Sequence, residues 1–240
     1  MQRENPIWIW LAAALVAAAL GFSLLPARWM LPEPTAVKPA SRPVEERWKI
    51  SAYDTLIRRV SREEGNDWRL LSAIAYHESR FTPDIVSPRG ARGLMQIMPS
   101  VARHFEIPCD SLLDPETNVR IANRLLNEIA VRLRIPASTA ENDRMRIVLA
   151  SYNSGIGHVA DARRLARHFG ENPNSWEVVA RYLNLKAEPD FYTHDVVQCG
   201  RFKGYRQTNR YVNEVMKRYA RYCRMTEGEE VPHALPDLPD

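Results

Sequence analysis

The chain has 240 residues, of which 45% are apolar and 26% are charged. This composition is typical of a globular protein and excludes a disulfide-rich miniprotein, a collagen and a fully disordered chain. The net charge is +4, but the last fifteen residues hold five acidic residues and no lysine or arginine, so residues 1–225 carry about +9.

A basic protein of this kind fits a polyanionic partner, such as nucleic acid, an anionic membrane surface or an acidic cell-wall polymer. The sequence contains no RNA-recognition signature, no Cys/His finger spacing and no Lys/Arg-rich run. We therefore predict no nucleic acid partner.

The N-terminal segment, residues 1–25, is predicted to meet a membrane. Residues 7–25 contain no charge, and as a helix they would span roughly 28 Å, close to the thickness of the hydrocarbon core. We interpret the segment as an uncleaved anchor, and the alternative is a cleaved secretion signal. Residues 26–45 contain five prolines and are predicted to form an extended linker.

Residues 46–225 are predicted to form one all-α domain, because apolar residues recur there with helical spacing and no long alternating pattern competes. Asp67 and Asp114 are expected to cap two of the helices. The expected helices lie at 51–64, 67–79, 115–133, 143–152, 158–169, 175–183 and 208–225. Residues 226–240 form an acidic tail that is predicted to be disordered.

The three cysteines have no metal-ligand spacing, so we predict no metal site. If the chain is exported, Cys199 and Cys223 could form a disulfide, with Cys109 left over; if it is cytosolic, all three would be small buried hydrophobic residues.

Glu78 is the first candidate for catalysis. It falls on the same helical face as Leu71, Ile74 and Ala75, where an apolar residue is expected. Burial would raise the pKa of this carboxyl to roughly 6 and make it a general acid near neutral pH. The structural alternative is an ion pair with Arg80 or Arg92.

The segment Ser87–Pro99 follows, with the sequence SPRGARGLMQIMP. Gly90 and Gly93 permit positive φ and close backbone approach, and Gln96 has both a donor and an acceptor. Such groups suit a sugar, whereas a phosphate-binding loop is disfavoured because its lysine is missing. A plain turn followed by a core helix is the other interpretation.

Four motifs in order resemble the catalytic domain of lytic transglycosylases of the soluble-lytic-transglycosylase, goose-lysozyme-like superfamily. They are ESRF at 78–81, SPRGARGLMQIMP at 87–99, SYNSGIG at 151–157 and YVNEVM at 211–216. Within this family, residues 158–165 and 172–176 are most similar to the catalytic module of the membrane-bound lytic murein transglycosylase F group. The resemblance implies a lysozyme-like all-α fold.

It also implies an enzyme that cleaves the β-1,4 bond between N-acetylmuramic acid and N-acetylglucosamine in peptidoglycan glycan strands, leaving 1,6-anhydro ends and using no cofactor. Glu78 would be the catalytic acid and base. By the same resemblance, the substrate-binding residues would be Ser87, Gln96, Met98, Tyr152, Asn153 and Tyr211, although Met98 and the two tyrosines also fit core positions.

The expected location is the cell envelope, with the domain in the periplasm, either anchored to the inner membrane or released after signal cleavage. Two other functions stay open. A hydrolytic muramidase would use Asp84 as a second carboxylate, and a non-catalytic peptidoglycan-binding protein would use Glu78 only for structure.

Overall fold

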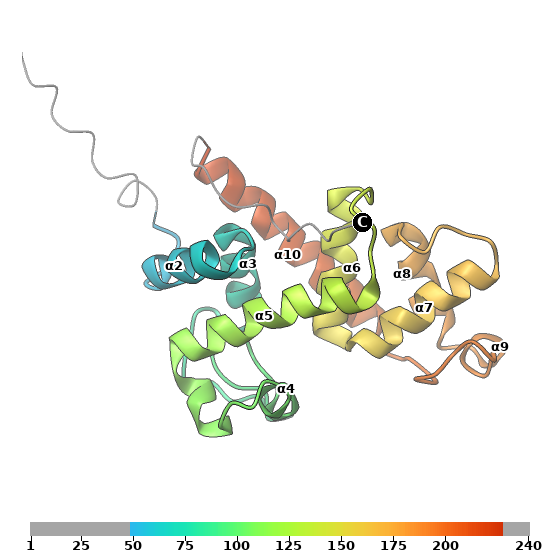
Figure 1. The fold of residues 1–240 in the computed structure, drawn as a ribbon, viewed down its shortest axis with the longest axis horizontal. Coiled ribbons are helices and arrows are strands. Elements are labelled where there is room, and N and C mark those ends of the chain that lie inside the picture. The colour runs from blue at the N-terminus through green and yellow to red at the C-terminus, as the bar shows by residue number, and fades with distance from the viewer. Residues whose placement is uncertain (1–48, 228–240) are drawn as a thin grey trace, which may run out of the picture. The chain divides into compact units, whose positions relative to one another are not determined.

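The computed structural model describes residues 49–227, and these form a helical domain (Figure 1). Its helices are α2 (Asp54–Glu64), α3 (Trp68–Ser79), α4 (Pro99–His104), the 3-10 helix η3 (Cys109–Leu113), α5 (Pro115–Leu133), α6 (Glu141–Ser154), α7 (Ile156–His168), α8 (Trp176–Leu185), α9 (Pro189–Tyr192) and α10 (Tyr205–Met225). The only pairings of strand type in residues 49–227 are isolated bridges that join Arg92 to Val86 and to Ile97. The predicted all-α class is confirmed.

The two expected N-terminal caps are present. The Asp67 carboxylate accepts the backbone N–H of Arg69 at 2.8 Å, and the Asp114 carboxylate accepts that of Thr117 at 2.8 Å. These bonds satisfy amide groups that a helix start leaves without partners. Helices α3 and α5 therefore begin where the sequence places them.

Some helix boundaries differ from the prediction. Helix α2 begins at Asp54 instead of Ser51, because the Asp54 carboxylate accepts the N–H groups of Ile50 and Ser51 and holds those residues in a turn. Helix α10 begins three residues early, at Tyr205. The sequence did not predict the short helices α4, η3 and α9, whose few turns are too brief to show a periodic pattern.

The order of helix packing brings distant segments together. Helix α5 crosses the middle of the domain, with α2 and α3 toward one end and α7, α8 and α9 toward the other (Figure 1). Helix α10 packs against α3, α6 and α8, and α6 packs against α5 and α7. The shared core contains Ile74, Leu126, Val148 and Val212, all of which are buried. The C-terminal end of α3 thereby lies in the same part of the fold as α6 and α10.

Several predictions fall on residues outside the described range. These are the membrane segment 7–25, the linker 26–45 and the acidic tail beyond Glu227. Thr226, which we assigned to the tail, is buried and donates a hydrogen bond to the carbonyl of Tyr222, so the packed domain includes it. Within residues 49–227, no helix has the length and apolar character needed to span a bilayer.

All three cysteines are free thiols. The possible bridge between Cys199 and Cys223 is therefore absent, and none of the three is fully buried, contrary to the alternative. Cys223 lies on α10, whereas Cys199 lies in the segment that precedes this helix and is exposed.

Candidate active site

Glu78 lies in the last turn of α3, at the junction with a long loop. The helix ends there because Arg80 and Phe81 both adopt left-handed φ angles of 55° and 63°. The Ser79 hydroxyl donates to the carbonyl of Leu94 at 2.8 Å and ties the end of α3 to the loop. Glu78 is thus held between a core helix and the glycine-containing segment Ser87–Pro99.

The Glu78 carboxyl is half-buried and has no ion pair among the described residues. Burial raises the pKa of Glu78 to about 7, and the nearby Tyr211 hydroxyl opposes this rise in part. The alternative ion pairs are not formed, because the Arg80 guanidinium lies 4.0 Å from the centre of the Tyr76 ring and Arg92 pairs with Asp110. A carboxyl with a pKa near 7 is half-protonated at neutral pH, as a general acid requires.

Two tyrosines from other helices face this carboxyl. Tyr152, in the last turns of α6, donates its hydroxyl to the carbonyl of Met95 at 2.7 Å. Tyr211, on α10, has a buried hydroxyl with no well-formed hydrogen bond in the described chain. Burial, followed by the charge of Glu78, raises the pKa of both tyrosines well above its usual value. The structure therefore brings Glu78, Tyr152 and Tyr211 together from α3, α6 and α10.

Asn153 joins two of these helices. Its side-chain oxygen accepts a hydrogen bond from the Thr208 hydroxyl at 3.0 Å. Because Thr208 precedes Tyr211 by one helical turn on α10, this bond fixes the relative position of the two tyrosine-bearing helices.

The remaining predicted residues, Ser87, Gln96 and Met98, lie in the loop. The Ser87 hydroxyl oxygen accepts the N–H of Ala91 at 3.0 Å. The Gln96 side-chain amide donates to the carbonyls of Ile85 and Gly93 at 3.2 and 3.0 Å. Met98 is exposed at the start of α4. In the described chain none of the three makes a hydrogen bond to Glu78, and two of them stabilise the loop itself.

Asn118, which the sequence analysis missed, holds this loop in place. It is fully buried on α5, accepts the N–H of Met95 at 2.7 Å and donates to the carbonyls of Arg92 and Leu112. One side chain thus satisfies two backbone groups of the loop and one of η3. The sequence feature that could have identified Asn118 is its polar amide next to Val119, on the apolar face of α5.

Gly93 is expected to tolerate no side chain. It has a φ of 77°, and a Cβ there would lie 2.5 Å from both the Asn118 amide nitrogen and the Leu112 carbonyl oxygen. We expect Gly93→Ala to lower the free energy of unfolding by about 3 kcal/mol, from backbone strain together with loss of the Asn118 contacts. Urea denaturation measures this change.

Gly90→Ala is the matched control for that prediction. Gly90 has a similar φ of 84°, but a Cβ there meets no atom within 4 Å. The Gly90→Ala variant should lose only about 1 kcal/mol of the free energy of unfolding, from backbone strain alone. Equal losses at the two glycines would contradict the steric role of Asn118.

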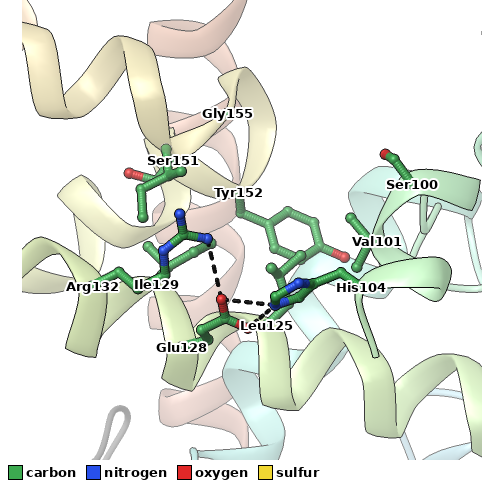
Figure 2. Close-up of a pocket in the computed structure, with 11 residues that line it drawn as sticks. Ser100, Val101, His104, Leu125, Glu128, Ile129, Arg132, Ser151, Tyr152 and Gly155 are labelled. Atoms are coloured by element: carbon green, nitrogen blue, oxygen red, sulfur yellow. Dashed lines mark hydrogen bonds and ion pairs between the residues drawn. The ribbon is translucent and has the colours of Figure 1, made fainter. Parts of the chain in front are cut away.

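A hollow of about 240 Å³ adjoins the site. Figure 2 shows the Tyr152 ring in its wall, together with Val101, Leu125 and Ile129, and an ion-paired row of Arg132, Glu128 and His104 along one side. Tyr152 therefore contributes its hydroxyl side to the Glu78 site and its ring to this apolar hollow.

Comparison with known proteins gives consistent results. The profile of the family described as "Transglycosylase SLT domain" matches residues 55–175. A membrane-bound lytic murein transglycosylase F of Marinobacter nauticus is 37% identical over 181 residues, which are 75% of this chain and 35% of that protein. One of Haemophilus influenzae is 36% identical over 166 residues, 68% of this chain and 33% of the relative. The chain thus spans about a third of the length of the curated relatives it matches.

Among solved structures, the lytic transglycosylase Slt of Pseudomonas aeruginosa, an inactive mutant, aligns with a TM-score of 0.51 at 22% identity. The alignment covers 75% of this chain and 25% of that one. This likeness shows a shared fold.

Proposed function

Because the chain belongs to the family of the transglycosylase SLT domain, with its lysozyme-like helical fold, we propose that it is a lytic transglycosylase that cleaves peptidoglycan glycan strands. The observation that carries this proposal is the Glu78 carboxyl. It is half-buried, it has a pKa raised to about 7, and it lies between two tyrosines without a cationic partner.

In the proposed reaction Glu78 acts first as an acid and then as a base. The protonated carboxyl gives its proton to the glycosidic oxygen, and the bond between that oxygen and C1 of the muramyl sugar breaks. The resulting carboxylate then takes the proton of the same sugar's C6 hydroxyl, whose oxygen attacks C1. A 1,6-anhydro ring forms, Glu78 returns to its protonated state, and no water is consumed.

The surroundings of Glu78 favour this internal nucleophile over water. Hydrolytic glycosidases place a second carboxylate about 5 to 9.5 Å from the first, to act as a nucleophile or to activate water. Among the described residues, only burial and Tyr211 shift the pKa of Glu78. Asp84, the alternative second carboxylate, is exposed in the loop after α3. An internal hydroxyl needs no such partner, because it is already held beside C1.

The other predicted residues receive supporting roles in this proposal. The buried Tyr211 hydroxyl, which lacks a full hydrogen bond, is available to the carboxylate of Glu78 or to the substrate's acetamido group. Tyr152 and Asn153 would flank the scissile sugar from the end of α6. Ser87, Gln96 and Met98 would border the sugar groove, with the Ser87 hydroxyl hydrogen and the Gln96 carbonyl oxygen facing substrate.

We further propose a location in the cell envelope. The relatives are named membrane-bound, and residues 7–25 carry no charge. An anchor of this kind, followed by the proline-rich linker, would hold the domain beside the wall. N-terminal sequencing of the membrane-bound form distinguishes an uncleaved anchor from a cleaved signal. If the protein is not found in membranes, the anchor is rejected.

The products test the proposed reaction directly. Residues 46–227 incubated with purified peptidoglycan should release muropeptides with anhydromuramyl ends, each one water lighter than the product of hydrolysis, as read by mass spectrometry. Reducing-end products would instead assign a muramidase and direct attention to Asp84. A folded protein that binds strands but releases no product would be a binding module.

A further inference from the structure

A groove of about 550 Å³ lies between α6 and α10, which pack against each other (Figure 1). Helix α6 lines it with Asn142 and Arg146, and α10 lines it with Asn213, Met216, Lys217, Tyr219, Ala220 and Cys223. We call this surface the α6–α10 groove. None of the candidate active-site residues lines it, so it is a separate surface.

One wall of the groove holds a fixed cation. The Arg146 guanidinium donates hydrogen bonds to the side-chain oxygens of Asn142 and Asn213, both at 2.8 Å. These bonds orient the group, but both acceptors are amides, so they do not neutralise its charge. Within residues 49–227, Arg146 has no ion pair with a carboxylate.

The rim that α10 contributes is also basic. Lys217, Arg221 and Arg224 are exposed, and their spacing of four and three residues places them on one face of the helix. In the described part of the chain none of the three forms a hydrogen bond or an ion pair with an acidic residue, and no acidic residue lines the groove. The groove therefore attracts carboxylates.

The floor of the groove is apolar. Met216, Tyr219 and Cys223 are half-buried there. The Tyr219 hydroxyl donates to the Asp67 carboxylate at 2.8 Å, which holds the aromatic ring in place. A rigid aromatic floor beside free cations suits a segment that combines apolar side chains with carboxylates.

The chain continues beyond α10 with a sequence of that chemistry. Residues 228–240 read GEEVPHALPDLPD, with four acidic residues, three prolines and no lysine or arginine. Val231, Leu235 and Leu238 supply apolar side chains between the acids. Proline-containing segments of this kind bind aromatic-lined grooves in extended form, at a low cost in conformational entropy.

The segment is long enough to reach the whole groove. Helix α10 ends at Met225, and Asn213 lies about 18 Å back along the helix at 1.5 Å per residue. An extended chain covers this distance with about six residues. A segment that turns back at Gly228 can therefore place Val231 over the floor and Asp237 near Arg146.

We propose that residues 228–240 bind the α6–α10 groove of their own chain. Val231 and Leu235 contact the floor, and the Asp237 carboxylate pairs with Lys217 and Arg146. Because the segment is attached at the end of α10, its effective concentration is in the millimolar range, so even weak contacts keep it bound. The bound segment braces α10, the helix that carries Tyr211.

The Cys223 thiol reports on the groove, because it lines the floor. In the full 240-residue chain, its alkylation by iodoacetamide should be about threefold slower than in a chain that stops at Glu227, since the bound segment covers it. Mass spectrometry of the alkylated peptides measures the rate. The exposed Cys199 lies outside the groove and should react at the same rate in both chains.

Charge reversal tests the pairing. Lys217→Glu should remove most of the difference between the full and shortened chains, and Asp237→Lys in the same protein should restore it, as expected for an exposed ion pair. Comparing the two chain lengths for each variant cancels any direct effect of the new charge on the thiol. Lys203→Glu, an exposed lysine outside the groove, is the matched control and should leave the difference unchanged.

Two results would overturn the proposal. One is an equal rate of Cys223 alkylation in the full and shortened wild-type chains, which would mean that the segment does not cover the groove. The other is protection that grows with protein concentration, because the groove would then hold the segment of a second copy. Protection that is independent of concentration supports binding within one chain.

Discussion

Glu78→Gln is expected to lower kcat on glycan strands by about a thousandfold or more, because the amide can neither donate a proton to the leaving oxygen nor accept one from the C6 hydroxyl. The two proton transfers are assigned to one residue, so no neighbouring group should rescue either. Release of anhydromuropeptides, followed by chromatography, measures the loss. In wild type the rate should fall as the pH rises above about 7, since burial raises the pKa of the acid to that value.

Thermal unfolding separates loss of catalysis from loss of fold. A carboxyl whose pKa is raised by folding binds more protons in the native state, so it destabilises the fold increasingly as the pH rises from its unfolded value to about 7. Glutamine resembles the protonated form. We therefore expect Glu78→Gln to melt at a higher temperature than wild type at pH 8 and at the same temperature at pH 4. A lower melting temperature at both pH values would mean that the activity was lost through misfolding.

Local patterns in the sequence predict much of the fold. The periodic spacing of Leu71, Ile74 and Ala75 predicts a buried face on α3, and all three residues are buried. The same spacing identifies Glu78 as a carboxyl at an apolar position, which is the origin of its raised pKa. The caps Asp67 and Asp114 are also local signals, because each carboxylate binds a backbone N–H only two or three residues further along the chain.

The long-range polar contacts have no such signal. Asn118 binds Met95 across 23 residues, and no periodic pattern indicates which backbone groups a buried amide will meet. Ser87 and Gln96 have the chemistry of sugar ligands, but much of their hydrogen-bonding capacity serves their own loop. In a segment without regular helix, backbone groups need side-chain partners, and short polar side chains supply them. The substrate roles of these two residues therefore stay predictions.

The segment that leads into α10 also depends on long-range hydrogen bonds to a buried polar side chain. Residues 193–204 form no helix, and their backbone is held by α7 and α8. The Asp161 carboxylate accepts the N–H groups of Gln198 and Cys199 at 2.8 and 2.9 Å, and Phe202 donates its N–H to the carbonyl of Lys186. Since α10 follows directly and carries Tyr211, these bonds help to place a tyrosine of the candidate site.

Asp161→Ala is expected to lower the free energy of unfolding by about 3 to 5 kcal/mol, a large part of the stability of a typical domain. Asp161 and Lys186 are both fully buried, with 2.5 Å between their charged atoms. Removing the carboxylate leaves the buried ammonium group with only the His158 ring nitrogen at 3.2 Å, and it takes the acceptor away from two backbone N–H groups. Chemical denaturation measures the loss, and the activity of the remaining folded protein should also fall as α10 loses its support.

An exposed ion pair provides the control for the Asp161→Ala variant. Glu116 pairs with Arg59 and Arg120 at the surface, and Glu116→Gln should leave the unfolding midpoint nearly unchanged because water screens such pairs. Although burial alone would raise it, the hydrogen bonds from Lys186 and the two N–H groups hold the pKa of Asp161 below its usual value. Its contribution is therefore present at neutral pH and is lost as the pH falls through that lowered pKa. A wild-type advantage over Asp161→Ala that did not shrink in acid would refute the assignment to the charged pair.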